Sequence, residues 1–199
     1  MLPMDEFATL RAERLVIQEE PAFVLPPGQA ILSGRPKGAE LLEDFMGAIR
    51  RKPEYSVTPL DFSNISFIDV SCADELLHKL LLRLRSGELG NRYVYLKGVN
   101  TSLRETIEAV LQLRDLSVLL KWEGGVVLLG VLKRPMREAL DVMLELKCAT
   151  SAKLSAALNK NVNIVCNRLN ALQRMGLVCR MRDGSVAGGG RQYYYVSII

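Results

Sequence analysis

Asparagine and arginine side chains gather in the last third of the chain, in a pattern that suits contact with nucleic acid. Asn163, Asn167 and Asn170 follow one another at spacings of four and three residues, which places them on the outward face of one helix. Asparagine can bond adenine N6 and N7 bidentately in the major groove of DNA. Arginine suits phosphate and minor-groove contacts, and the arginines in and after this helix are Arg168, Arg174, Arg180, Arg182 and Arg191.

A second segment with chemical potential is Asp69-Val70-Ser71-Cys72-Ala73, a small polar cluster between an apolar run and a leucine-rich one. Ser71 stands where a strand is expected to become a helix. Either Ser71 or Asp69 can cap that helix by accepting a bond from its first backbone N–H groups. A phosphate on Ser71 would be accommodated at the positive end of the helix, so a phosphorylation switch is the alternative to a cap.

Residues suited to catalysis or metal binding are sparse. The sequence contains no GxxxxGK[ST] loop and no GxSxG turn, and the single histidine, His78, lies among leucines without an obvious acidic or nucleophilic partner. No CxxC pair occurs among the four cysteines, which are Cys72, Cys148, Cys166 and Cys179. We therefore expect no enzyme activity, no metal, no cofactor, and free thiols in a reducing compartment.

The composition is that of an ordinary soluble globular protein, with 199 residues of which 49% are hydrophobic and 24% charged. No apolar run approaches the roughly 20 residues needed to cross a bilayer. The first residues are acidic and charged where a signal peptide would be basic and then apolar. We expect a cytoplasmic protein without a membrane partner.

Charge divides the chain into two parts. Residues 1–132 carry 15 Lys or Arg against 18 Asp or Glu, whereas residues 133–199 carry 11 against 4, a net charge of +7. Pro135 follows this boundary and is suited to the first turn of a helix. We expect two domains, residues 1–132 and residues 133–199, with the second able to fold alone.

Strands and helices are expected to alternate in the first part. Strands are expected at 15–18, 29–32, 58–61, 65–69 and 92–96, with a hairpin formed by 119–122 and 126–131; helices are expected at 39–51, along the leucines from Leu76 to Leu84, and at 102–113. This alternation predicts an α/β domain with a largely parallel sheet and an antiparallel edge.

The second part predicts three helices and a hairpin. Met136 to Leu144 have the apolar spacing of a core-facing helix, Thr150-Ser151 can cap a second helix, and Asn161 can cap a third that ends at Gly176. Strands are then expected at 177–182 and 192–197, joined by a long tip. The order predicts a small α+β domain with a helix-turn-helix frame.

The segment from Leu60 to Leu76, LDFSNISFIDVSCADEL, resembles the signature of STAS domains, the fold of the anti-sigma-factor antagonists. In that family an apolar strand ends in Asp-Ser-Ser-Gly before a helix, and the similarity covers residues 15–131. The resemblance maps the family's phospho-acceptor serine onto Ser71 and its aspartate onto Asp69, while Val70 and Cys72 stand in place of a serine and a glycine. It implies a mixed sheet with helices, and a domain that senses a signal or binds a partner protein.

The residues TSAKL (150–154), VCNRLNAL (165–172) and MGLV (175–178) resemble the winged helix-turn-helix domains of MarR-like and ArsR-like regulators, over residues 135–199. That resemblance implies duplex DNA as the partner, and it leaves homodimer formation open. Two functions follow as hypotheses. The first is a transcription regulator with a STAS-like sensor domain. The second is a partner-switching module controlled at Ser71, in which the winged helix makes only protein contacts.

Overall fold

A mixed six-stranded sheet forms the centre of the computed structural model, which describes residues 17–26, 28, 30–182 and 193–199. Its strands are β1 (Gln18–Glu19), β2 (Phe23–Val24), β4 (Ser56–Asp61), β6 (Arg92–Lys97), β7 (Ser117–Trp122) and β8 (Gly125–Gly130). Strands β1 and β2 both pair with β4, and β6, β7 and β8 follow in that order. All pairings are parallel except β7 with β8. The expected α/β fold and its antiparallel edge are confirmed.

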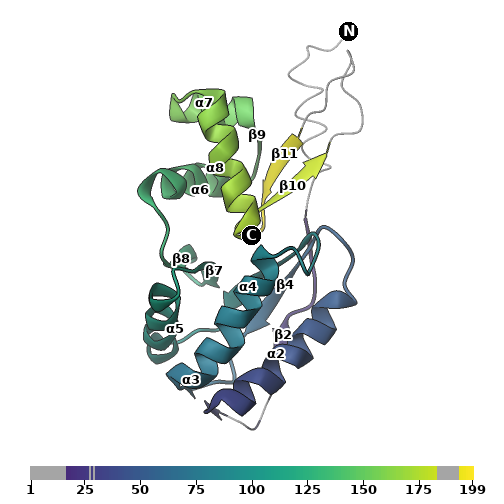
Figure 1. Cartoon of the computed structure of the whole chain (residues 1–199), viewed down its shortest axis with the longest axis vertical. Helices are drawn as coiled ribbons and strands as arrows, with labels where there is room; N and C mark the ends of the chain where they lie inside the picture. Colours follow the sequence, from purple (N-terminus) through teal and green to yellow (C-terminus); the bar gives the residue numbers. More distant parts are fainter. Residues whose placement is uncertain (1–16, 27, 29, 183–192) are drawn as a thin grey trace.

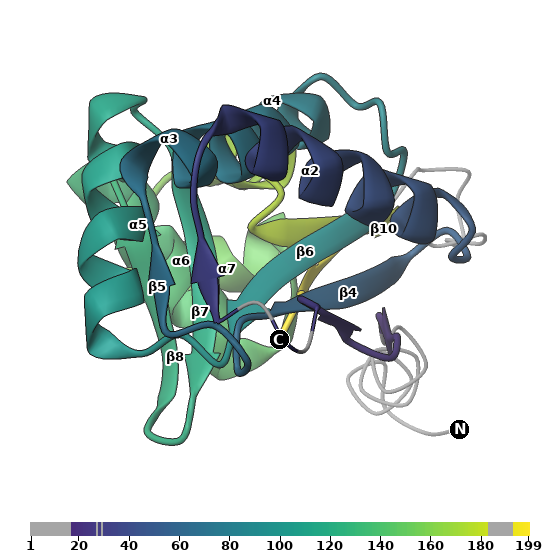
Figure 2. The ribbon, with the colours of Figure 1, turned by 90° about the horizontal axis from the view of Figure 1, so that it is seen from below.

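Helices cover one face of this sheet. They are α2 (Arg35–Arg50), a continuous helical segment made of α3 (Val70–Ala73), η1 (Asp74–His78) and α4 (Lys79–Arg85), and α5 (Thr101–Leu113). Figure 2 shows α2 and α4 lying along β4 and β6. Leu60, Val94, Leu96, Val118 and Leu120 point from the strands into the core under these helices.

Several element boundaries differ from the expectations. Helix α2 begins at Arg35 instead of residue 39, because Pro36 is tolerated in the first turn. Of the expected strand 65–69 only β5 (Phe67–Ile68) forms, paired with β3 (Ile31–Leu32) in a separate two-stranded ladder. Half of the expected strand 15–18 lies outside the described residues, Gln18 begins β1, and β2 was not expected.

The last third forms a three-stranded antiparallel sheet beside three helices. The strands are β9 (Cys148–Thr150), β10 (Val178–Arg182) and β11 (Tyr193–Ser197), in the order β10-β11-β9, and the helices are α6 (Arg134–Leu146), α7 (Ser151–Leu158) and α8 (Val162–Arg174). Thr150 and Asn161 cap α7 and α8 as expected, and Gly176 takes a positive φ of 74° after α8. Strand β9 was not expected. No helix in the described ranges is long and apolar enough to span a bilayer.

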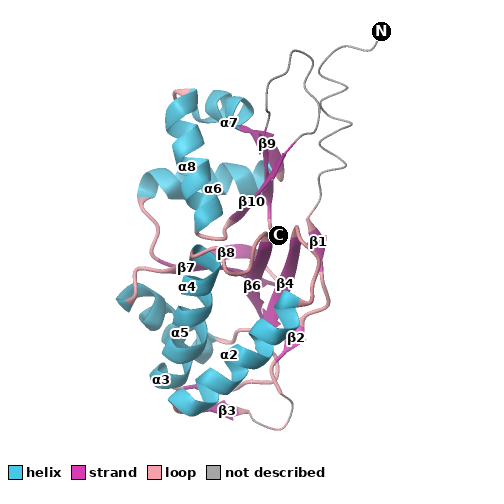
Figure 3. Cartoon of the chain, turned by 45° about the vertical axis from the view of Figure 1, so that its right-hand side comes forward, coloured by secondary structure: helices cyan, strands magenta, loops and turns pink. Residues whose placement is uncertain are grey.

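The second face of the large sheet packs against this last third. Side chains alternate along a strand, so Val57, Tyr93, Tyr95 and Leu119 point away from the helix-covered face. They belong to one buried cluster with residues of α6, α8 and β10, such as Leu140, Leu169 and Val178. Figures 1 and 3 show the smaller sheet and α6 to α8 stacked on the side of the larger sheet opposite α2 and α5. One of the two buried clusters of the protein therefore includes residues from both sides of the boundary at residue 132.

Candidate functional site

The outer face of α7 and α8 carries two of the polar residues that the sequence assigned to DNA contact, Asn163 and Asn167. Asn163 and Asn167 are exposed, and so are two apolar residues beside them, Val162 (45%) and Ile164 (49%). The side chain of Asn161 accepts a bond from the Asn163 amide at 2.9 Å, which holds the first turn of α8. Figure 1 shows α7 and the start of α8 at the end of the molecule remote from α3 and α5.

Two of the residues expected to contact DNA, Arg168 and Asn170, make contacts within the protein instead. The Arg168 side chain is only 16% exposed, and its Nη1 lies 3.9 Å from Glu138 on α6. Asn170 is half-buried, and its Oδ1 accepts bonds from the Tyr195 hydroxyl at 2.8 Å and from Arg180 Nη1 at 3.2 Å. A helix that packs on two neighbours presents only part of its surface, so both side chains connect α8 to α6 and to the hairpin strands.

The hairpin strands bring further arginines near α8. The Arg180 guanidinium lies 4.8 Å from the ring centroid of Tyr193 in a cation–π contact, in addition to its bond to Asn170. Arg182 pairs across the strands with Tyr193 and is exposed. Arg191 lies outside the described residues.

Cations without an ion pair to any described residue lie around the α7–α8 turn. Lys153 on α7 and Lys160 in the turn are exposed, and neither side chain has a polar partner in the described part of the chain. Neither lysine was expected to contact DNA, because only arginines were considered for phosphate contact. The net positive charge of residues 133–199 was the signal that could have indicated them. Arg174 lies at the opposite end of α8, facing Arg85 of the first part.

The polar cluster at the start of α3 is capped by Asp69. Its Oδ1 accepts from the Cys72 amide at 2.7 Å, and its Oδ2 accepts from the Gly34 amide at 2.8 Å and from the Ser33 hydroxyl. The Ser33 and backbone bonds lower the pKa of this carboxyl. Ser71 is exposed; its backbone amide bonds the Asp69 carboxylate and its carbonyl accepts from the Asp74 amide, whereas its hydroxyl has no hydrogen bond to the described residues. Of the two capping candidates, Asp69 is the cap.

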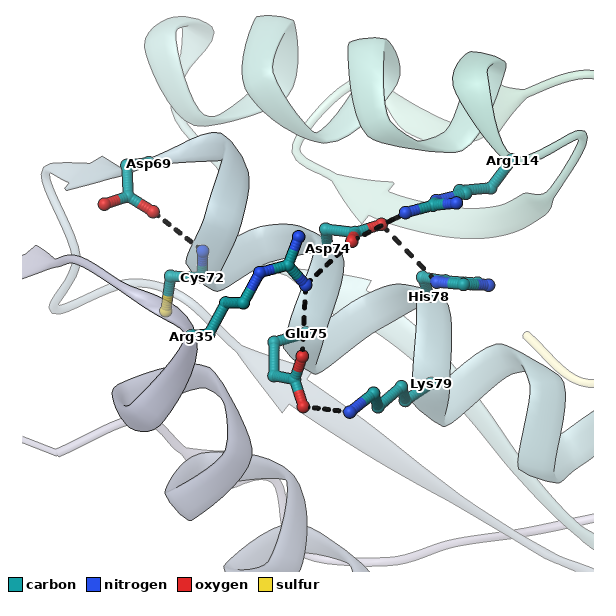
Figure 4. Close-up of polar contacts among 8 residues, drawn as sticks. All are labelled: Arg35, Asp69, Cys72, Asp74, Glu75, His78, Lys79 and Arg114. Atoms are coloured by element: carbon teal, nitrogen blue, oxygen red, sulfur yellow. Dashed lines mark hydrogen bonds and ion pairs between the residues drawn. The ribbon is translucent and has the colours of Figure 1, made fainter.

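Next to this cap, a π-helical segment carries two buried carboxylates (Figure 4). Asp74 accepts two bonds from Arg114, at 2.7 and 2.9 Å, and Glu75 pairs with Lys79. Arg35 Nη1 lies 3.5 Å from Asp74 and 3.4 Å from Glu75. Hydrogen bonds from Arg114 and from Lys79 lower the pKa of Asp74 and of Glu75 respectively.

His78 has an acidic neighbour after all, since its Nδ1 lies 3.4 Å from Asp74 Oδ1, one helical turn away. Asp74 is already bound by Arg114, and no nucleophilic side chain completes the pair in Figure 4. The arrangement is a set of ion pairs that holds η1 between α2 and α5. The expectation that His78 lacks an acidic partner was wrong because it overlooked the residue four positions earlier.

An exposed apolar patch borders Ser71. Ile31 (64%) and Phe67 (44%) are cross-strand partners in the β3–β5 ladder, and Val70 (54%) is the residue before Ser71. Hydrophobic side chains that gather on a surface often mark a contact with another protein. We define these three residues as the Phe67 patch.

The cysteines are free thiols among the described residues. Burial raises the pKa of Cys72 and of Cys179 to about 11, so neither is a thiolate near neutral pH. In the part of the chain that the structure describes, no three His, Cys, Asp or Glu side chains are grouped to hold a metal ion.

Comparisons with known proteins leave the family open. No protein-family model matches the chain, and no curated protein does. The geometry of the described residues therefore supplies the basis for assigning a function.

Proposed function

We propose that the chain is a DNA-binding transcription regulator, in which residues 133–199 form a winged helix and the first part is a STAS-like domain that senses a signal or binds a partner. One observation carries the proposal. The exposed asparagines of α8, Asn163 and Asn167, share one end of the molecule with the unpaired cations Lys153 and Lys160. Side chains that can read bases are thus flanked by side chains that can neutralise phosphates.

In this proposal the first turns of α8 enter the major groove. Asn163 and Asn167 contact base edges, and Val162 and Ile164 are suited to the methyl group of thymine. Lys153 and Lys160 contact phosphates on either side of the groove. Arg182, on β10, contacts a phosphate or the minor groove.

Arg168 and Asn170 act by holding the reading helix in place. Arg168 packs against α6 near Glu138, and Asn170 connects α8 to β10 and β11. Neither is assigned a direct DNA contact, although the sequence predicted one for each. The buried cluster that joins α8 to the large sheet provides a physical route between the two parts of the chain.

Salt-dependent binding tests the proposal. We expect the full chain to bind a random-sequence duplex at low ionic strength, measured by fluorescence anisotropy, with log affinity falling linearly as log salt concentration rises. Lys153→Gln, Lys160→Gln and Arg182→Gln should each weaken all duplexes similarly and reduce that slope by about one unit. Arg104→Gln is the matched control, because it removes one charge from α5, at the other end of the molecule.

Base reading is tested separately, on a duplex selected from a random pool by the intact protein. Asn163→Ala and Asn167→Ala should each cost about 1 to 3 kcal/mol on the selected site and little on random duplexes, because a base-edge contact carries sequence information. The salt slope should stay unchanged. A chain that shows no salt-sensitive duplex binding at low ionic strength would rule out the regulator.

Partner switching is the second candidate function, and the exposed Ser71 beside the Phe67 patch favours it. A phosphate there would add about two negative charges next to Asp69 and next to an apolar contact surface, which would weaken an apolar docking contact. We expect mass spectrometry of the protein from its native cells to find phosphate on Ser71, and Ser71→Asp to change the set of proteins that co-purify. Unmodified Ser71 under several growth conditions would count against this candidate.

A further inference from the structure

A cavity of about 140 Å³ lies where the last turn of α8 meets the loop between α4 and β6. A more open groove, bordered by Arg85 and Arg174, adjoins it. One water needs only about 10–15 Å³ of such space, so a polyatomic ligand fits. Figure 1 shows the end of α8 beside α4, which places this cavity between the two parts of the chain.

Three arginines line the cavity, and no Asp or Glu is among the described residues that line it. Arg85, Arg92 and Arg174 are among its lining residues. Arg92 is already paired with Glu54 at 2.8 Å. Arg85 donates to the Asp115 backbone carbonyl at 3.3 Å and also interacts with the charge of the Asp115 carboxylate. Within the described ranges neither Arg85 nor Arg174 has a carboxylate within the roughly 4 Å of an ion pair. Two guanidinium groups from different parts of the chain thus border one space without a directly bonded carboxylate among the described residues.

A buried hydroxyl lies behind this lining. Tyr93 is 3% exposed and is one of the lining residues, but its hydroxyl is fully buried and faces Gln173, Cys179 and the Arg180 backbone, so it does not open into the cavity. Burial also raises the pKa of Tyr93, so the hydroxyl is neutral. The Gln173 side chain, which also lines the cavity, can offer a neutral donor.

Backbone donors contribute little here, because the amides of Gly87, Gly90 and Gly176 are bonded within their own turns. Recognition therefore falls to the side chains. Two guanidinium groups and the Gln173 side chain on one cavity match a tetrahedral oxyanion, because guanidinium binds phosphate bidentately.

We propose that this cavity binds a phosphate group, supplied either by inorganic phosphate or by the end of a small phosphomonoester. The bound group bridges Arg85 of the first part and Arg174 of α8, so it stabilises the contact between the two parts. The proposal goes beyond the DNA-binding function, and its test requires no DNA.

Thermal unfolding of the full chain provides the first test, in potassium phosphate and in potassium chloride at matched ionic strength. We expect the midpoint to rise with phosphate concentration and to saturate, since a ligand that binds only the folded state stabilises by mass action. Isothermal titration with inorganic phosphate and with glycerol 3-phosphate then separates the two sources. The probe with the lower Kd identifies which kind of phosphate the site prefers.

Variants distinguish phosphate binding in the cavity from the general stabilisation that phosphate gives because it is excluded from protein surfaces. Arg85→Gln and Arg174→Gln should each weaken the saturable binding at least tenfold. Arg182→Gln is the matched control, because it removes one charge from an exposed position outside the cavity and should leave Kd unchanged. Absence of saturable binding, or an equal loss in Arg182→Gln, would overturn the proposal.

Discussion

The carboxylate of Asp69 joins two segments that are far apart in the sequence. It accepts from Ser33 and Gly34, which precede α2, and from Cys72 in the first turn of α3. One side chain therefore satisfies donors at the starts of two helices. Ser71, two residues later, is exposed and contributes only its backbone amide to these bonds, not its hydroxyl.

Removing these two side chains should have different effects on stability. Asp69→Ala should lower the free energy of unfolding by about 1 to 2 kcal/mol, because a lost N-cap costs that much. Ser71→Ala should change it by less than about 0.5 kcal/mol, as is usual for an exposed residue. Urea unfolding of both variants measures the difference, and equal losses would show that Ser71 shares the capping role.

Acid should destabilise the protein through the Asp74–Arg114 pair. The hydrogen bonds from Arg114 lower the pKa of Asp74 in the folded state, below about 3.9 for an unfolded aspartate. The stabilisation is therefore fully present above about pH 4 and is lost as pH falls through the folded pKa.

The test compares urea midpoints at pH 7 and pH 3. Arg114→Gln should be less stable than the parent at pH 7 and should lose less stability between the two values, because Asp74 then titrates closer to its unfolded pKa. Arg104→Gln, which breaks an exposed pair on α5, should leave the pH dependence unchanged. The same loss of stability between pH 7 and pH 3 in both variants would contradict the role of the Asp74–Arg114 pair.

At the scale of elements, the contact between α2 and α3 depends on one glycine. A Cβ on Gly38 would lie 2.6 Å from the Cys72 carbonyl oxygen and 2.7 Å from Glu75 Cβ, both too close for any real contact. The small residue lets α2 approach the segment that carries Asp69 and Ser71. Close helix packing thus positions the capped helix start.

Gly38→Ala should destabilise the fold by about 1 to 3 kcal/mol, despite the better helix propensity of alanine, because the added methyl group meets backbone. Gly47→Ala, in the same helix, should stabilise it by about 0.5 to 1 kcal/mol, since the nearest atom to its Cβ would be the end of the Arg51 side chain, 3.8 Å away. Thermal or urea unfolding measures both. A destabilised Gly47→Ala variant would mean that helix propensity does not determine whether alanine stabilises or destabilises α2 at this position.

At the scale of the whole molecule, the large sheet is covered on both faces. The helices α2, α4 and α5 pack on one face, and the last third packs on the other through Tyr93, Tyr95 and Leu119. The division into two domains at residue 132 stays a prediction. It requires each part to remain folded without the buried contacts that the two parts share. Either part alone would expose apolar surface that the intact chain buries.

The fragment of residues 133–199 tests this condition. We expect a cooperative thermal transition, because its helices and strands bury residues of their own such as Leu169 and Val178, but at a lower temperature than in the intact chain. Leu119→Ala in the full chain should cost about 2 to 5 kcal/mol, and amide hydrogen exchange should quicken in α8 as well as in β7. A fragment without a cooperative transition would mean that the last third requires the sheet.

Local sequence signals determined most of the elements. Thr150 and Asn161 cap helices, Gly176 follows one, and apolar spacing located α5, α6 and α8 within a few residues of their observed bounds. The alternation of strands and helices predicted the parallel sheet with its antiparallel edge. Such signals act between residues close in sequence, so they can be read without knowing the fold.

Tertiary structure alone decided which side chains remain free. Asn170 has the spacing of an outward residue and Arg168 was expected to flank the helix, yet contacts with Tyr195 and Glu138, distant in sequence, withdraw both from the surface. Asp69, with Ser33 and Gly34 as partners, took the capping role that the sequence left open between two residues. The cavity that Tyr93 and Arg174 both line could likewise not be predicted from the sequence, because it joins segments about eighty residues apart. Exposure and pairing depend on what packs against a residue, and the chain specifies that only once it has folded.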